Sequence, residues 1–251
     1  MPFLFDAHCH VTRNMEARPF SAHIDPQRRR LVCGVRPDDD WPVVADWARA
    51  WPGTTPAFGI HPWEAAARNG DWEKELETLL ARFPGAWVGE IGLDGIKLNR
   101  APMERQTDIL ARQLRIAVRF DRRVNLHCVK AYDELLALLD KEYFPSGRKG
   151  FILHSFNGPH RMVKEFADRG AYFSVGPLAS RHDTRKIRAR VALLPSERIV
   201  LESDAFLEPG LDAEEELLFT LRWLAELKET DFGTMAQTIA DTSRRILDAG
   251  H

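Results

Sequence analysis

The feature that most constrains the fold is a regular alternation of short apolar runs with segments long enough for a helix. Eight such runs occur in the 251 residues, and several are rich in Val, Ile and Phe and bounded by Gly or Pro. Strands buried on both faces have this composition, and the alternation with helices favours parallel strands. The eight runs cover residues 3–10, 31–35, 56–61, 87–93, 124–128, 151–155, 171–175 and 199–204.

Helical spacing is clearest over residues 102–120, which start with Pro near the first turn and repeat Met103, Leu110, Leu114 and Ala117 along one face. Further helices are expected over residues 132–139, 161–169, 185–194, 213–228 and 232–247. Eight strands alternating with helices over about 250 residues predict a closed (β/α)8 barrel of the TIM type. Active sites of such barrels lie at the carboxyl ends of the strands.

One stretch fits this architecture poorly. Residues 12–30 show little helical periodicity and contain Pro19 and Pro26, so we expect an irregular loop over the mouth of a distorted barrel. No internal repeat, low-complexity tract or Gly/Ser linker divides the chain. Residues 1–251 are therefore predicted to form one domain.

Charge and hydropathy exclude several classes of protein. The 35 Lys and Arg nearly balance the 37 Asp and Glu, so no global field draws the chain to duplex nucleic acid or to an anionic membrane. The longest apolar run, over residues 135–139, is far shorter than the ~18 to 20 residues of a membrane span. The first residues do not have the pattern of a signal peptide, and Cys9, Cys33 and Cys128 lie in strand-like runs that suit reduced thiols. We therefore expect a cytoplasmic protein.

Ionisable side chains stand at the ends of five of the eight predicted strands. His8 and His10 are two residues apart on a strand, so they point to the same side and can chelate one ion, while Cys9 points away. Glu90 lies in an apolar run, where an unpaired charge is costly and a cation is a suitable partner. The fifth, sixth and eighth runs also end on ionisable side chains, which are His127, His154 and Asp204. For His8 and His10 taken alone, the alternative is two partly exposed histidines without a metal.

Six ligands are too many for one tetrahedral zinc but suit two divalent ions that share a carboxylate. One ion is predicted at His8, His10 and Asp204. The second is predicted at His127 and His154, with Glu90 as the bridge. Mixed imidazole and carboxylate ligands accept Zn²⁺, Mn²⁺ or Mg²⁺.

The ordered motifs resemble the TatD family of metal-dependent hydrolases, in the amidohydrolase superfamily. The resemblance spans nearly the whole chain and rests on DAHCH at 6–10, GIHP at 59–62, GEIGLD at 89–94, RQ and QL in the helix at 105–106 and 113–114, His127, HSFNG at 154–158, and ESDA at 202–205. It implies a barrel fold, divalent metal at the positions named above and a deoxyribonuclease-type phosphodiesterase activity.

The chain departs from the family pattern beside the ligands. Where the family commonly has Ser-Arg-Asp-Ala after the fifth-strand histidine, this chain has Val129 in place of the Arg, and Lys130 supplies a charge without a guanidinium fork. Trp63 stands where the family has a second His, and Phe206 where it usually has Pro. These differences concern the substrate rather than the metal.

The expected mechanism is hydrolysis by a water held between the two ions, whose charge lowers its pKa and stabilises the phosphoryl oxygens. Asp204 is expected to orient that water and take its proton, and Glu90 is the second catalytic carboxylate. For substrate binding we predict Lys130, Arg181 and His61. His61 also fits a position behind a metal ligand or a structural role, and a solvated helix face is the alternative for the basic segment 181–190.

Without a long basic stripe, a single-stranded DNA end or a small phosphodiester is a better substrate than extended duplex. No membrane and no stable protein partner are expected. Two alternatives remain: a metal-dependent amide, lactone or ester hydrolase of the same superfamily, and a metal-binding barrel without catalysis. Glu90 argues against the first, because many superfamily members use a carboxylated Lys there. The complete ligand set argues against the second.

Overall fold

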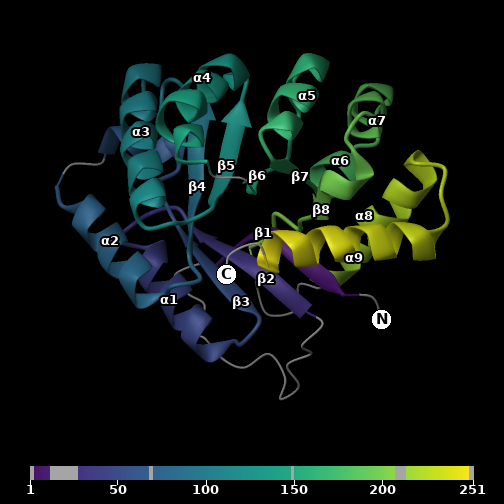
Figure 1. The fold of residues 1–251 in the computed structure, drawn as a ribbon, viewed down its shortest axis with the longest axis horizontal. Coiled ribbons are helices and arrows are strands. Elements are labelled where there is room, and N and C mark those ends of the chain that lie inside the picture. The colour runs from purple at the N-terminus through teal and green to yellow at the C-terminus, as the bar shows by residue number, and fades with distance from the viewer. Residues whose placement is uncertain (1–2, 12–27, 68–69, 148–149, 207–212, 249–251) are drawn as a thin grey trace.

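The computed structural model describes residues 3–11, 28–67, 70–147, 150–206 and 213–248. Eight parallel strands pair in chain order, and the last pairs with the first, so the sheet closes into a barrel. Helices lie around the outside of the strands (Figure 1). The predicted (β/α)8 barrel is therefore confirmed.

The strands coincide with the predicted runs and differ mainly at their ends. Their bounds are β1 Leu4–His10, β2 Arg28–Gly34, β3 Thr54–Phe58, β4 Trp87–Asp94, β5 Val124–Val129, β6 Phe151–Leu153, β7 Ala171–Val175 and β8 Ile199–Leu201. The expectation of an irregular loop over residues 12–30 is wrong for its last three residues, which pair with residues 4–6 of β1. Residues 12–27 of that loop lie outside the described residues. The third, sixth and eighth strands end earlier than expected, so His61, His154 and Asp204 follow their strands.

The expected helices form, and further ones occupy the connections that the sequence left open. Their bounds are α1 Asp40–Ala50, α2 Trp72–Arg82, α3 Met103–Arg119, α4 Tyr132–Glu142, α5 His160–Asp168, α6 Pro177–Ser180, α7 Arg185–Ala192, α8 Ala213–Leu227 and α9 Phe232–Asp248, with 3-10 turns η1 Pro62–Ala67, η2 Phe144–Ser146 and η3 Ser196–Arg198. In α2 the buried side chains Trp72, Leu76 and Leu80 recur every four residues and form one apolar face. None of the helices in the described parts of the chain has the length and hydropathy needed to cross a bilayer.

Buried apolar side chains form two clusters. The larger one includes the inner faces of the helices, such as Trp41 and Leu114, with strand residues such as Cys9 and Ile91. The smaller one comes from six strands and α9, and its members are Phe5, Ala7, Leu31, Cys33, Ala57, Trp87, Ile152, Val200 and Ile246. Side chains of this kind fill the inside of a barrel. The cysteines are buried and free, as predicted.

Gly92 brings β4 against β5 at the level of the candidate site. Its φ of 154° is in the range that favours glycine, and a Cβ built there would lie 1.9 Å from the carbonyl oxygen of His127. We expect Gly92→Ala to lower the free energy of unfolding by at least about 1–3 kcal/mol, because β5 has to move. Urea unfolding would measure this, with Gly85→Ala as the matched control, since a Cβ at Gly85 meets nothing within 4 Å. Equal stability of the two variants would contradict the close approach.

Candidate metal centre

The six predicted ligands converge at the carboxyl ends of the strands, around the carboxylate of Glu90. Its Oε2 lies 3.4 Å from Nε2 of His8 and 3.7 Å from Nε2 of His10. Its Oε1 lies 2.9 Å from Nδ1 of His127 and 3.9 Å from Nε2 of His154. Residues from three other strand ends thus meet within hydrogen-bonding or ion-pair distance of this buried carboxylate, which β4 supplies.

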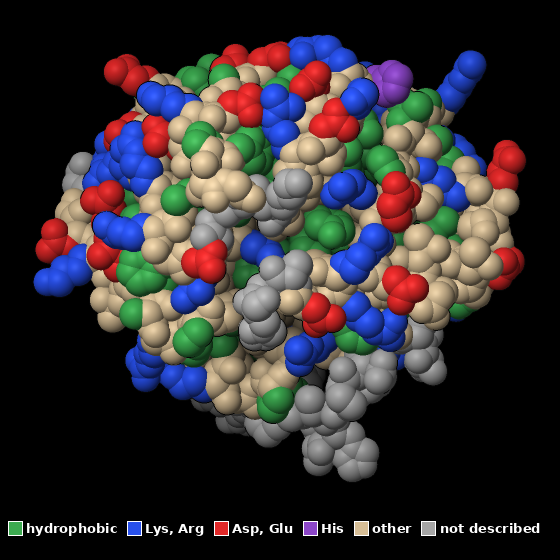
Figure 2. Space-filling view, viewed as in Figure 1, with side chains coloured by type: hydrophobic (Ala, Val, Ile, Leu, Met, Phe, Trp, Pro, Cys, Tyr) green, Lys and Arg blue, Asp and Glu red, His purple; other side chains and the backbone are tan. Residues whose placement is uncertain are grey.

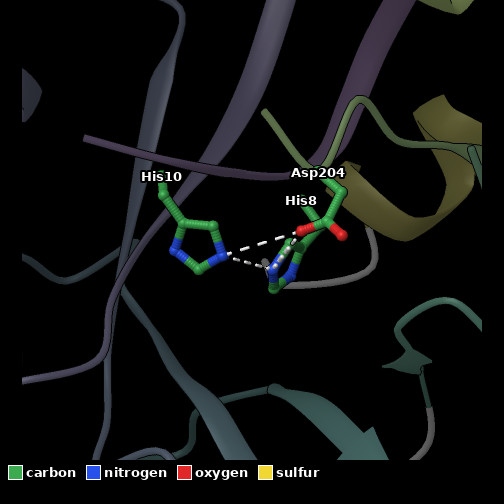
Figure 3. Close-up of side chains that lie close together, drawn as sticks. All are labelled: His8, His10 and Asp204. Carbon is green, nitrogen blue, oxygen red and sulfur yellow. Dashed lines mark hydrogen bonds and ion pairs between the residues drawn. The ribbon is translucent and has the colours of Figure 1, made fainter. Parts of the chain in front are cut away.

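Asp204 faces the same centre from the loop after β8. Its Oδ1 lies 3.8 Å from Nε2 of both His8 and His10 and 3.9 Å from Nε2 of His154. Figure 3 shows the carboxylate directed toward the two β1 imidazoles. The side chain is 41% exposed, whereas Glu90 is almost fully buried, so Asp204 is the carboxylate that solvent can reach.

The donor atoms fall into three groups, in each of which all atoms lie within 4.8 Å of one another. The first group, His8, His10 and Asp204, is the predicted set for one ion. The other two groups are His8, Glu90 and His154, and His61, Glu90 and His127. His127 and His154 therefore belong to different groups, with ring centroids 6.3 Å apart, although both face Glu90.

Hydrogen bonds at the outer side of the rings turn Nε2 lone pairs toward this centre. Nδ1 of His10 lies 3.1 Å from the carbonyl oxygen of Cys33, which can only accept, so Nδ1 carries the proton. Nδ1 of His8 lies 2.9 Å from Oδ1 of Asn125, whose amide orientation follows from the bond that its Nδ2 donates to the Ala7 carbonyl. In the neutral form of each ring, Nε2 is then an unprotonated acceptor.

Two such acceptors cannot face each other without a positive charge between them. Nε2 of His8 and Nε2 of His10 are only 2.9 Å apart. Burial, with the neighbouring charge of His8, lowers the pKa of His10 to about 3, so His10 stays neutral. Burial opposes a charge on His8 as well, but Cys33 and Glu90 outweigh it and raise the pKa of His8 well above its ordinary value. The site therefore favours a cation at this position, and a divalent metal ion fits where a proton would otherwise be held.

His154 is oriented in the same way by Glu202. Its Nδ1 lies 2.7 Å from Oε2 of Glu202, and the hydroxyls of Ser155 and Ser174 also donate to this fully buried carboxylate. Burial by itself raises the pKa of Glu202, but its interaction with His154 and the hydrogen bond from Ser155 outweigh burial and hold the pKa at about 2. Glu202 is thus ionised and directs the Nε2 lone pair of His154 toward Glu90.

We expect Glu202→Gln to lower metal affinity about 10- to 100-fold, because the amide is a weaker acceptor for His154. Metal titration with a competing chelator would measure the change. Glu134→Gln, on the exposed face of α4, is a suitable control. An unchanged affinity in Glu202→Gln would show that His154 does not depend on this carboxylate.

His61 and His127 approach Glu90 from the opposite end, and their hydrogen bonds differ. The backbone N–H of Trp63 donates to Nδ1 of His61 at 3.2 Å, so neutral His61 carries its proton on Nε2, which lies 3.5 Å from Oε1 of Glu90. His61 is therefore a hydrogen-bond donor toward Glu90 rather than a lone-pair ligand. Nε2 of His127 lies 3.4 Å from Oδ2 of Asp94, which leaves Nδ1 facing Glu90.

Charges within the centre are strongly coupled. Burial by itself raises the pKa of Glu90, but its interactions with His61, His8 and His127 outweigh burial and hold it well below its usual range. Burial by itself lowers the pKa of His127, but its hydrogen bonds to Asp94 and Glu90 outweigh burial and raise the pKa to about 9. Glu90 is thus a permanent negative charge between imidazoles.

Sequence reasoning missed the residues that orient the ligands. Asn125 precedes His127 by two residues and so shares its side of β5, and Glu202 precedes Asp204 by two residues. Asp6 is also buried, and it accepts hydrogen bonds from the backbone N–H and hydroxyl of Ser203 at 2.9 and 2.6 Å, which holds the segment that carries Asp204. The spacing of two residues from His127 could have identified Asn125 from the sequence, because side chains two apart on a strand point to the same side.

The three predicted substrate-binding residues lie in different settings. His61 is buried beside Glu90, as described above. Lys130 follows β5 directly and is exposed. Arg181 is paired with Glu216 through two hydrogen bonds of 3.1 and 2.8 Å, and its guanidinium lies 3.7 Å from the ring centroid of Phe219. Arg181 would have to leave this pair before it could bind a phosphate.

Charges of both signs are mixed on the molecular surface seen in Figure 2, where Lys and Arg side chains alternate with Asp and Glu. No continuous basic stripe crosses the described residues on that face. The mixture of charges agrees with the small net charge, and on this face it gives no extended track for a duplex.

Comparisons with known proteins agree with this geometry. Residues 5–248 match the model of the TatD related DNase family. The 3'-5' ssDNA/RNA exonuclease TatD of Cronobacter turicensis is 31% identical over 197 residues, which are 78% of this chain and 72% of that protein. The uncharacterized metal-dependent hydrolase YjjV of Escherichia coli is 28% identical over 210 residues, 80% of this chain and 78% of YjjV.

Solved structures show the same barrel. The crystal structure of YjjV from Escherichia coli superposes with a TM-score of 0.78 at 25% identity and covers 97% of both chains. A hydrolase of the TatD family from Entamoeba histolytica has a TM-score of 0.77 at 13% identity, covers 98% of both chains and shares the fold. With a family match over almost its whole length, this chain belongs to the TatD related DNase family.

Proposed function

We propose that this chain is a divalent-metal-dependent phosphodiesterase of the nuclease type. The observation that carries the proposal is the convergence of two carboxylates with three imidazoles, each of which has its Nδ1 hydrogen-bonded on the side away from the centre. These residues are His8, His10, His154, Glu90 and Asp204. Names of relatives support the reaction class, since one is a 3'-5' ssDNA/RNA exonuclease and another a metal-dependent hydrolase.

Two ions, of Zn²⁺, Mn²⁺ or Mg²⁺, are our proposal for the cofactor. His8, His10 and Asp204 would hold one, His127 and His154 the other, and Glu90 would lie between them. His8, His10 and His154 fit this role because hydrogen bonds at their Nδ1 atoms already direct their Nε2 lone pairs toward the centre. When bound, the ions would act as Lewis acids that lower the pKa of water and neutralise phosphoryl charge.

The residues of the chain have distinct tasks in the proposed reaction. Asp204 is the exposed carboxylate of the centre, and it would orient the attacking water and accept its proton. Its backbone N–H donates to the His8 carbonyl at 3.0 Å, which holds the loop after β8 against β1. His61 would keep Glu90 in place through its Nε2–H, and Glu202 would keep His154 in place. Lys130 and Arg181 remain predicted phosphate contacts.

For the substrate we propose a single-stranded end or a small phosphodiester. The first test is hydrolysis of bis(4-nitrophenyl) phosphate and of a labelled thymidine oligomer after chelation and re-addition of Mg²⁺, Mn²⁺ or Zn²⁺ in turn. We expect hydrolysis with at least one ion and none with EDTA. Elemental analysis of the purified chain would identify the ion and its stoichiometry.

The same assay separates the alternatives. Hydrolysis of a nitrophenyl ester or a lactone without hydrolysis of either phosphodiester would favour an amide, lactone or ester hydrolase. Metal bound at the site without hydrolysis of any substrate would favour a non-catalytic barrel.

A further inference from the structure

An exposed indole ring lies at the rim of the candidate metal centre. Trp63, the second residue of η1, is 37% exposed. Its ring stands edge-on to two imidazoles of the centre, with centroids 4.8 Å from His61 and 6.3 Å from His127. A large aromatic surface therefore faces solvent directly beside the residues that contact Glu90.

The indole is held in place rather than free to turn. Its Nε1–H donates to Oδ2 of Asp94 at 2.7 Å, and the same oxygen lies 3.4 Å from Nε2 of His127. Two cations approach the ring, with Nζ of Lys97 at 5.8 Å and the guanidinium of Arg100 at 6.0 Å from its centroid. The orientation of the indole is thus fixed before any ligand arrives. Because the ring is already ordered, less conformational entropy is lost when a flat group binds to it.

A second exposed ring lies at the other end of the centre. Phe206 is 53% exposed and stacks on His10, with centroids 5.2 Å apart and an interplanar angle of 27°. His10 lies on the Oε2 side of Glu90, whereas His61 and His127 lie on the Oε1 side. One exposed aromatic side chain therefore stands beside each end of the carboxylate.

We propose that Trp63 and Phe206 are stacking platforms for the bases of a single-stranded nucleic acid, one on each side of the phosphodiester held at the proposed metal centre. The inference rests on the proposed phosphodiesterase function and adds the feature by which the substrate is selected. Every base has a flat face, and an aromatic side chain can stack on it only where no neighbouring base covers it, as in a single strand. Lys97 and Arg100 would meet backbone phosphates beside Trp63.

The test compares two oligomers that differ only in their bases. One is a thymidine oligomer and the other is an abasic oligomer of equal length, both with phosphorothioate linkages that slow cleavage. Fluorescence anisotropy measures the affinity of the metal-loaded full chain for each, and the readout is the ratio of the two dissociation constants. Because both oligomers carry the same charge, this ratio measures how much the bases contribute to the affinity.

We expect Trp63→Ala and Phe206→Ala each to reduce the preference for the thymidine oligomer by about 5-fold or more. Trp63→Phe should retain most of the preference, because it keeps the aromatic face and loses only the bond to Asp94. Phe232→Ala is the matched control. Phe232 is 40% exposed with the guanidinium of Arg222 at 6.0 Å, but it lies at the start of α9.

An unchanged ratio in Trp63→Ala and Phe206→Ala would overturn the proposal. Equal loss in Trp63→Phe and Trp63→Ala would overturn it for Trp63, since the bond to Asp94 would then explain the effect. If the unaltered chain hydrolyses bis(4-nitrophenyl) phosphate but shows no preference for bases, stacking fails while the phosphodiesterase function stands. If it hydrolyses no phosphodiester with any ion, the proposed function itself fails.

Discussion

Replacement of Glu90 by Gln is expected to lower the metal content of the centre and to lower phosphodiester turnover by at least about 10³-fold. The substitution keeps the shape of the side chain and removes its charge. Five imidazole rings have a nitrogen within 3.9 Å of this carboxylate, and its negative charge makes their approach favourable. They belong to His8, His10, His61, His127 and His154. A neutral amide would hold the proposed pair of cations more weakly than a carboxylate would.

Metal content by elemental analysis and kcat with bis(4-nitrophenyl) phosphate would check this expectation. Glu134→Gln again serves as the control, and circular dichroism would show whether the barrel still forms. Retention of both metal and turnover in Glu90→Gln would contradict the central role of this residue. Loss of metal with an intact fold would support it.

Asp204→Asn is expected to act on turnover more than on metal content. We expect kcat to fall about 10²- to 10⁴-fold, the usual contribution of a general base. The other groups of donors, built on Glu90 with His8 and His154 or with His61 and His127, do not include Asp204. Most of the ligand set therefore survives the substitution, while the exposed carboxylate that could accept a proton is lost.

Metal content and kcat measured on the same sample of Asp204→Asn would separate the two effects. Asp168→Asn, on the exposed face of α5, is a control for the change of charge. If Asp204→Asn lost its metal and then recovered the full rate after metal was restored, Asp204 would be a ligand and not the base.

The sequence by itself determined the barrel and the residues that meet at its mouth. Alternating strand and helix patterns are local signals, and eight of them leave few topologies other than a closed parallel barrel. An ionisable residue at the end of an apolar strand is also a local signal, and barrel closure brings such residues together. For this reason the amino-acid pattern alone is enough to name the six converging side chains, which are His8, His10, Glu90, His127, His154 and Asp204.

Only the tertiary structure decided how these residues are oriented. The tautomers of His8 and His154 depend on partners far away in the chain, Asn125 and Glu202, and no local pattern pairs residues 117 or 48 positions apart. The same holds for Arg181, whose carboxylate partner lies 35 residues away on α8. A side-chain hydrogen bond requires its donor and acceptor to be placed to within a few tenths of an ångström. Residues this far apart in the chain reach such positions only once the barrel has closed.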